Sequence, residues 1–176
     1  MVVFDSSILI LVFDPNAKPP TDPATDRPVA RAAERVGHLI STLEKAKEKI
    51  IVPTPVLSET LVYAGPNMRE IIGELSKQSC FRIADFDQKA AIEAAVAVRD
   101  ALDRGGWRVD GAKPGETKAK IKFDRQIVAI AKAEGAQTVY TDDGSMAKYA
   151  ERAQIQAIRT ADLDLPPEDP QRSWDL

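Results

Sequence analysis

The stretch VVFDSSILI, residues 2–10, places a carboxylate directly behind a short apolar run. The run that ends at Phe4 is typical of a buried strand, and Asp5 stands where that strand would have continued into the core. Aspartate is a preferred helix cap, so Asp5 could simply cap a segment that begins at Ser6. A functional meaning requires other acids at equivalent places in the fold.

The composition bounds the classes of protein to consider. The chain has 176 residues, of which 44% are hydrophobic, and this suits one domain with a substantial core. The formal net charge of −3 excludes a surface that is cationic overall, so an anionic substrate would need a local basic patch or metal ions. Cys80 is the only cysteine, which excludes an internal disulfide and makes a cytoplasmic location the default expectation. No apolar run reaches membrane-spanning length and no leader segment precedes the first strand, so we expect no membrane partner.

Short apolar strands alternate with amphipathic helices along the chain. Strands are expected at 2–4, 50–53, 80–84, 137–141 and 155–159, and helices at 28–49, 54–65, 67–78, 85–106, 123–136 and 145–153. This alternation predicts an α/β fold with a mainly parallel sheet covered on both faces. We expect a single domain over 1–165 with irregular insertions near 14–28 and 105–120, and a loosely held tail at 166–176.

Five acids lie where such a sheet would form a site, outside the carboxyl ends of its strands. Asp5 ends the first strand, and Glu59 follows the strand at 50–53. Asp142 and Asp143 follow the strand at 137–141, and Asp124 begins the helix before that strand. Each one taken alone has a plain alternative, as a helix cap or as a surface residue on a helix whose face is misplaced.

Two of these acids are expected on the core-facing sides of their helices, where a solvated carboxylate does not normally lie. Asp124 is followed at i+3, i+4 and i+7 by apolar residues, and Glu59 has apolar neighbours on its predicted face: Val56, Val62 and Tyr63. If the acids converge, two carboxylates about 5 Å apart repel by roughly 3 kcal/mol at an effective dielectric near 20. Such a group would shift its pKa values or bind a cation, and oxygen ligands alone favour Mg²⁺ or Mn²⁺.

Other site chemistries have less support. His38 is the only histidine and lies off the apolar stripe of its helix, which argues against Ser-His-Asp catalysis and histidine-bound zinc. Cys80 has no histidine near it at a strand end, so a thiol nucleophile is not expected. Basic residues cluster in the sequence before Asp124 and directly after it. The members of this cluster could be ordinary solvated side chains or could contact a phosphate backbone: Lys113, Lys118, Lys120, Lys122 and Arg125.

The order VVFDSSILI, then PVLSETL, then KFDRQIVAIAKAEGAQTVYTDD resembles the PIN-domain nucleases, including the VapC-type toxins. That family pattern is an Asp-Ser/Thr pair after the first strand, a Glu on a following helix, an Asp opening a late helix and a Thr-x-Asp after the next strand. The resemblance spans most of the chain outside the two insertions and the tail. The sequence departs from it at Ser145, where the family commonly has an acid, and at Met146, where an aromatic residue is common.

The resemblance implies a three-layer α/β/α sandwich and Mg²⁺- or Mn²⁺-dependent hydrolysis of RNA phosphodiester bonds. The metal-binding acids carried over by position are Asp5, Glu59, Asp124 and Asp143. Ser6 would orient Asp5 through its hydroxyl, and Thr141 would act in the same way near Asp143. The predicted RNA contacts are Lys118, Lys120, Lys122 and Arg125. Partners implied are an RNA substrate, an antitoxin protein if the chain is a toxin, and a second copy in a homodimer.

The neighbouring acids after strand 137–141 should not be equivalent. Side chains alternate in extended chain, so Asp143 is expected to share the direction of Thr141 while Asp142 points the other way. The chain turns here towards Gly144, which keeps Asp142 open as a further metal ligand.

Two rival classes stay open. One is a PIN-like module that binds RNA or a protein without cleaving, and a non-toxin RNA-processing nuclease is a related alternative. The other is a phosphoaspartate protein with Asp5 as acceptor, which would call for a lysine at a late strand end where this chain has Arg159.

Overall fold

The computed structural model describes residues 1–106 and 115–167. Its centre is a five-stranded sheet in the order β5-β4-β1-β6-β7, in which every neighbouring pair is parallel. The strands are β1 (Val2–Phe4), β4 (Ile50–Pro53), β5 (Phe81–Ala84), β6 (Thr138–Tyr140) and β7 (Gln156–Ile158). The prediction of a mainly parallel sheet is confirmed, and all five strands lie within the predicted ranges.

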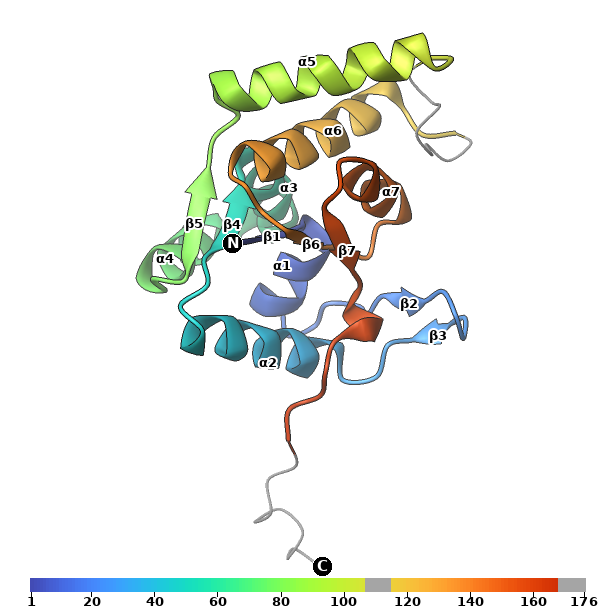
Figure 1. Ribbon diagram of the computed structural model, residues 1–176. Helices are drawn as coiled ribbons and strands as arrows, with labels where there is room; N and C mark the ends of the chain where they lie inside the picture. The colour runs from blue at the N-terminus through green and yellow to red at the C-terminus, as the bar shows by residue number, and fades with distance from the viewer. Residues whose placement is uncertain (107–114, 168–176) are drawn as a thin grey trace, which may run out of the picture.

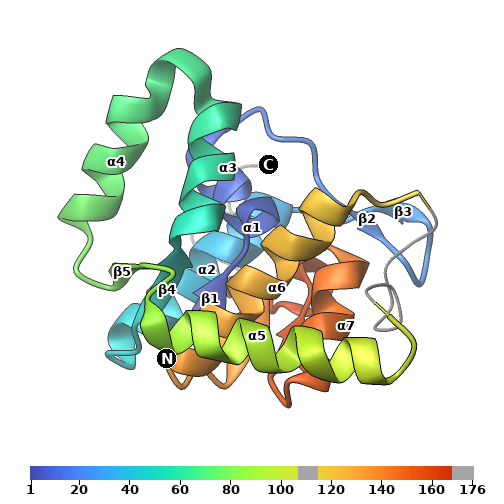
Figure 2. The ribbon, with the colours of Figure 1, turned by 90° about the horizontal axis from the view of Figure 1, so that it is seen from above.

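Helices cover both faces of this sheet. Figure 1 shows α5 and α6 on one side and α1 and α2 on the other, and in Figure 2 α5 and α6 lie side by side. The three-layer α/β/α arrangement is therefore confirmed. The helices are α1 (Ser6–Phe13), α2 (Ala32–Lys45), α3 (Thr54–Ala64), α4 (Met68–Lys77), α5 (Gln88–Asp103), α6 (Lys118–Ala133) and α7 (Gly144–Arg152), with 3-10 turns η1 (Gly65–Asn67) and η2 (Thr160–Asp162).

The central strands are continuous apolar runs because they are buried on both faces, as a parallel sheet between two helical layers requires. Val3, Phe4 and all of Ile50, Ile51 and Val52 are fully buried. The ring of Phe4 packs edge-on against the ring of Tyr140 on the neighbouring β6, with centroids 5.4 Å apart. A charged side chain directly after β1 is therefore carried to the rim of the best-packed part of the molecule.

Helix α6 begins five residues before the predicted start at 123, which is a correction to the sequence analysis. Thr117 is its N-cap, and its hydroxyl accepts the backbone N–H of Lys120 at 3.2 Å. Asp124 therefore lies in the second turn of the helix and does not open it. The helix ends at Ala133, three residues before the predicted end at 136, and Gly135 follows it with φ +69°, a conformation that favours glycine.

The predicted insertion at 14–28 is not wholly irregular. It contains a short antiparallel ladder of β2 (Thr21–Asp22) and β3 (Arg27–Pro28). The turn between them is closed by the Asp22 side chain, which accepts the N–H of Ala24 at 2.8 Å and the hydroxyl of Thr25 at 2.9 Å. This local closure by Asp22 was not predicted from the sequence.

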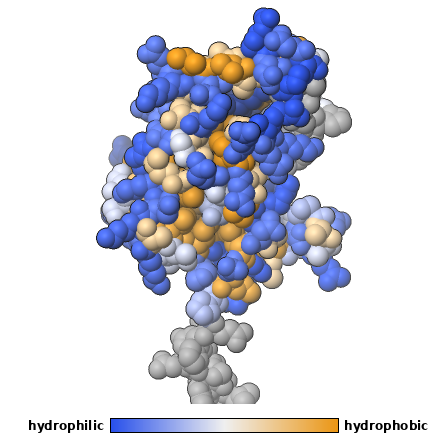
Figure 3. Space-filling model, in the orientation of Figure 1, coloured by the Kyte–Doolittle hydropathy of each residue, from blue (hydrophilic) through white to orange (hydrophobic). Residues whose placement is uncertain are grey.

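Parts of two other predicted segments lie outside the described residues. The parts that lie outside the described residues are 107–114 of the second insertion and 168–176 of the tail. The end of the insertion, 118–120, is described and is helical. Within the described ranges, no helix is long and apolar enough to cross a membrane. Figure 3 shows apolar side chains at the surface over α5, where Ile92 and Val96 are exposed.

Candidate active site

Asp5 and Thr141 meet because their strands pair in register. Phe4 lies opposite Tyr140 in the β1–β6 ladder, and the N–H of Asp5 donates to the Tyr140 carbonyl at 3.1 Å. The first residues beyond the two strands therefore lie next to each other. The Thr141 hydroxyl donates to Asp5 Oδ2 at 2.7 Å, and the two residues are 0% and 5% exposed. This bond fixes one oxygen of a buried carboxylate.

Two serines at the start of α1 complete the surroundings of Asp5. Ser7 Oγ donates to Asp5 Oδ2 at 3.2 Å and accepts the N–H of Asp142 at 3.1 Å. Ser6 Oγ lies 3.5 Å from Asp5 Oδ1 but only 2.9 Å from Glu59 Oε2. A hydroxyl has one hydrogen to donate, and the shorter contact is the better one. Ser6 thus mainly links Glu59 to the site, while Ser7, which the sequence analysis did not select, holds Asp5.

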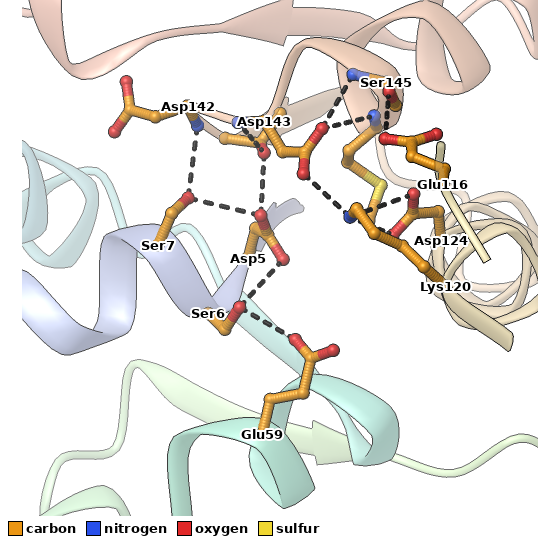
Figure 4. A network of polar contacts seen from close by, with 12 residues as sticks. Asp5, Ser6, Ser7, Glu59, Glu116, Lys120, Asp124, Asp142, Asp143 and Ser145 are labelled. Atoms are coloured by element: carbon orange, nitrogen blue, oxygen red, sulfur yellow. Dashed lines mark hydrogen bonds and ion pairs between the residues drawn. The ribbon is translucent and has the colours of Figure 1, made fainter. Parts of the chain in front are cut away.

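Glu59 reaches the site from an exposed position, which corrects the expectation that it faces the core. Its supposed apolar neighbours Val62 and Tyr63 are 78% and 53% exposed. The buried positions of α3 include Val56 and Thr60, so the core-facing stripe of the helix runs beside Glu59. The carboxylate still joins the others through Ser6, and Figure 4 shows it on the far side of Ser6 from the remaining acids.

Asp124 and Asp143 share one lysine. Lys120 Nζ lies 3.2 Å from Asp124 Oδ1 and 2.8 Å from Asp143 Oδ2. Asp124 is 4% exposed and shares its helix face with buried Ile127, which confirms that this acid faces the core. Lys120, predicted as an RNA contact, is turned towards the carboxylates (Figure 4).

The two acids after β6 point in different directions, as predicted. Asp143 is the N-cap of α7, and its Oδ1 accepts the N–H groups of Ser145 at 2.7 Å and Met146 at 3.3 Å. Asp142 instead accepts the hydroxyl of Thr160 at 2.6 Å and its N–H at 3.0 Å, and in Figure 4 its carboxylate points away from Asp143. Asp142 is therefore removed from the predicted metal ligands. Thr141, expected to act on Asp143, does so by accepting its N–H at 3.0 Å.

The environments of the buried acids separate their pKa values. Burial raises the pKa of Asp5, although the Thr141 hydroxyl opposes this effect. Burial likewise raises the pKa of Asp124 to about 7, more than the nearby Lys120 ammonium lowers it. For Asp143, burial acts in the same direction, but the bond and charge of Lys120 and the helix N–H groups outweigh it and lower the pKa. One ammonium thus serves two carboxylates, and Asp143 is the one held firmly ionised.

A sixth acid, Glu116, also reaches the site and was not predicted from the sequence. Ser145 Oγ, which is buried, donates to Glu116 Oε1 at 2.7 Å. Glu116 precedes the Thr117 cap of α6, so it is brought to the site by the early start of that helix. A carboxylate therefore does lie beside Ser145, the position at which the chain departs from the PIN pattern, but it is supplied by a different segment.

The predicted RNA-contact set divides into accessible and inaccessible members. Lys118 and Lys122 are exposed on α6. Arg125 is only 5% exposed, and its guanidinium lies 5.5 Å from the ring centre of Tyr149, an arrangement suited to packing. Arg125 is therefore removed from the predicted phosphate contacts, because a buried guanidinium cannot reach an RNA backbone. Lys113 lies outside the described residues.

The donor set fits a hard divalent cation in kind. Its groups are carboxylates from β1, α3, α6 and the β6–α7 junction, and they already hold a cationic group, the Lys120 ammonium. Within the two described ranges, however, no three acidic, histidine or cysteine side chains are already gathered as a formed metal centre. Binding would therefore require Glu59, Lys120 or both to move.

Comparison with known proteins supports the fold. No protein-family model and no curated protein matches the chain. Among solved structures, it is similar to a chain of VapBC2 from Rickettsia felis bound to a DNA fragment from their promoter, with TM-score 0.56, 16% identity and coverage of 90% of this chain and 98% of that one.

Two further DNA-bound structures resemble it to a similar degree. A chain of FitAB has TM-score 0.54, 19% identity and coverage of 93% and 98%, and a chain of VapBC from Salmonella typhimurium has 0.53, 13%, and 90% and 97%. At these identities the likeness is one of fold, and it confirms the PIN-like, VapC-like architecture expected from the sequence.

Proposed function

We propose that this chain, which has the fold of the VapC-type PIN domains, is a metal-dependent endoribonuclease that hydrolyses RNA phosphodiester bonds. One observation carries the proposal. Three acids from separate elements, Asp5, Asp124 and Asp143, approach one rim of the sheet, and a cationic group already lies between two of them. Asp5 and Asp124 are buried, and burial of a carboxylate is unfavourable unless something binds it.

The residues of the chain divide the work by their surroundings. A bound Mg²⁺ or Mn²⁺ would supply an activated water and stabilise charge on the phosphate. Asp5 and Asp143 are held by hydroxyl and N–H donors and would bind the ion without reorienting. Glu59 is exposed and is joined to the site by the hydroxyl of Ser6, so it is the carboxylate that can adjust when an ion and substrate arrive. Neither the single histidine nor the single cysteine lies among these groups, so no covalent protein intermediate is assigned.

The exposed lysines of α6 suit RNA. Lys118 and Lys122 flank the turn that carries Lys120, and phosphate contacts from such side chains are independent of base sequence. With a net charge of −3, binding must come from this local patch and from the bound metal.

We further propose that the chain is the toxin of a toxin–antitoxin pair. Similar chains occur in VapBC2 and FitAB structures bound to DNA, so the expected partner is an antitoxin protein, and a second copy of the chain is the other expected partner. Either could cover the apolar side chains exposed on α5. Size-exclusion chromatography with light scattering would test the homodimer, and co-purification with a co-expressed candidate antitoxin would test the antitoxin.

A cleavage assay tests the activity. Purified protein should cut single-stranded or structured RNA when Mg²⁺ or Mn²⁺ is added and not in EDTA, and Asp143→Asn should abolish the cutting. A second function, RNA or protein binding without cleavage, is favoured by the lack of three gathered ligands among the described residues. RNA binding with no metal-dependent cleavage under any of these conditions would establish that second function and refute the first.

A further inference from the structure

The Lys120 ammonium is placed as a cation between two acids and not as a surface charge. Its contact with Asp124, at 3.2 and 3.3 Å to the two oxygens, is an i,i+4 pair within α6. Such a pair on an open helix surface contributes little to stability. Here the ammonium also lies 2.8 Å from Asp143, which caps a different helix, so it bridges α6 and α7.

The oxygens that Lys120 uses are the ones a metal ion would use. Asp143 Oδ1 is already bonded to the N–H groups of Ser145 and Met146, so Oδ2 is the oxygen turned towards Lys120. Both oxygens of Asp124 face the ammonium. A divalent ion held by these two carboxylates would therefore have to take the place of the ammonium, and the two positive charges would also repel each other.

We propose that Lys120 is an internal competitor of the divalent ion: it holds Asp124 and Asp143 in the metal-free protein and must withdraw before a metal can bind both. This inference rests on the proposed metal-dependent function and deepens it. The geometry supports withdrawal, because the lysine side chain is 41% exposed while the Asp124 side chain is 6% exposed, so the cation can swing out and the carboxylate cannot. Once released, the ammonium remains at the rim of the site, where a phosphate group of RNA would arrive.

Mn²⁺ titration without RNA tests the competition. Lys120→Met keeps the length of the side chain and removes its charge. It should bind Mn²⁺ about tenfold more tightly than the wild type or better, because the metal no longer has to displace a charge-assisted hydrogen bond. Lys120→Arg keeps a cation there and should not tighten binding. Lys148→Met, which removes an exposed lysine from α7, is the matched control and should also leave the affinity unchanged.

A second measurement uses only the wild-type protein, in case a variant does not fold. Acetylation of lysines followed by mass spectrometry should show Lys120 reacting faster when Mn²⁺ is present, since the ion frees its amine. Lys118 and Lys148 should react at the same rate with and without the ion.

The outcomes separate this inference from the proposed function. If neither the wild type nor Lys120→Met binds Mn²⁺ at millimolar concentration, the metal-dependent function fails. If the wild type binds Mn²⁺ but Lys120→Met binds it equally or more weakly and Lys120 labelling does not rise, Lys120 is only a structural bridge between α6 and α7 and the inference is overturned.

Discussion

Replacing Asp124 by asparagine tests whether the site carries a buried acid that resists ionisation. The folded protein holds the pKa of Asp124 at about 7, whereas the unfolded chain has an ordinary value of 3.8. Between these values the folded state binds a proton that the unfolded state does not. The contribution of this group to the stability of the fold must therefore rise as the pH falls from about 8 towards 5. Asparagine cannot ionise, so Asp124→Asn should remove that part of the pH dependence.

The size of the effect follows from the same two values. Each pKa unit corresponds to about 1.4 kcal/mol, so the full separation would be about 4 kcal/mol. Over the practical interval from about pH 8 to about pH 5.5, proton linkage gives about 2 kcal/mol of added stability in the wild type. At the upper pH, Asp124→Asn also removes the unfavourable burial of a charge, which stabilises the folded state. Part of this stabilisation is offset because the ion pair with Lys120 is lost.

Urea unfolding in EDTA at the two pH values measures this directly. The free-energy difference between Asp124→Asn and the wild type should favour the variant at the upper pH and shrink by about 2 kcal/mol at the lower pH. Asp103→Asn is the control, because this aspartate is exposed at the end of α5 and should leave the wild-type pH slope intact. Equal slopes for Asp124→Asn and the wild type would refute the reasoning, since Asp124 would then be ionised in both states.

Three further results are expected. Millimolar Mn²⁺ or Mg²⁺ should raise the melting temperature of the wild type. Asp5→Asn should be more stable than the wild type without metal, and its melting temperature should rise less when metal is added. An unchanged melting temperature in the wild type would mean that the acids do not form a cation site. Asp143→Asn should abolish metal-dependent cleavage while Asp142→Asn lowers it modestly, because only the first faces the site; a dead Asp142→Asn with an active Asp143→Asn would show the assignment to be reversed. Changing Lys118 and Lys122 together to alanine should weaken RNA binding. The slope of log affinity against log salt concentration should become shallower by up to roughly one unit per lost phosphate contact. An unchanged slope would mean that both lysines are only solvated side chains.

The fold was predictable because its signals are strong and local. The buried strands are continuous apolar runs between helices of clear period, and this pattern permits few arrangements other than a covered parallel sheet. The acids at strand ends were predictable because they directly follow the apolar runs, whereas the pairing of β1 with β6, which places Asp5 beside Thr141, was not predicted.

The wrong predictions concern the first residue of one helix, α6, and the buried face of another, α3. Starting α6 at 123 hid the i,i+4 relation of Lys120 to Asp124 and the approach of Glu116 to Ser145. Thr117 followed by a run of helix-forming residues is a capping signal that could have moved that start. The face of α3 was less accessible to reasoning, because its apolar residues lie on both sides and exposed Val62 resembles a core residue.

The position of β1 in the sheet explains why Asp5 is buried while Glu59, at the other end of the same site, is exposed. β1 is the middle strand of the five, so the residue after it is shielded by neighbours on both sides, and Asp5 is almost fully desolvated. Thr141 from the adjoining strand and Ser7 from α1 partly compensate for this, and they fix the carboxylate as a consequence. Glu59 lies on a peripheral helix and keeps its solvent. The proposed RNA substrate is too large to enter the core, so it would meet the exposed rim of the site, where Glu59 and the partly exposed Lys120 lie, while Asp5 stays inside.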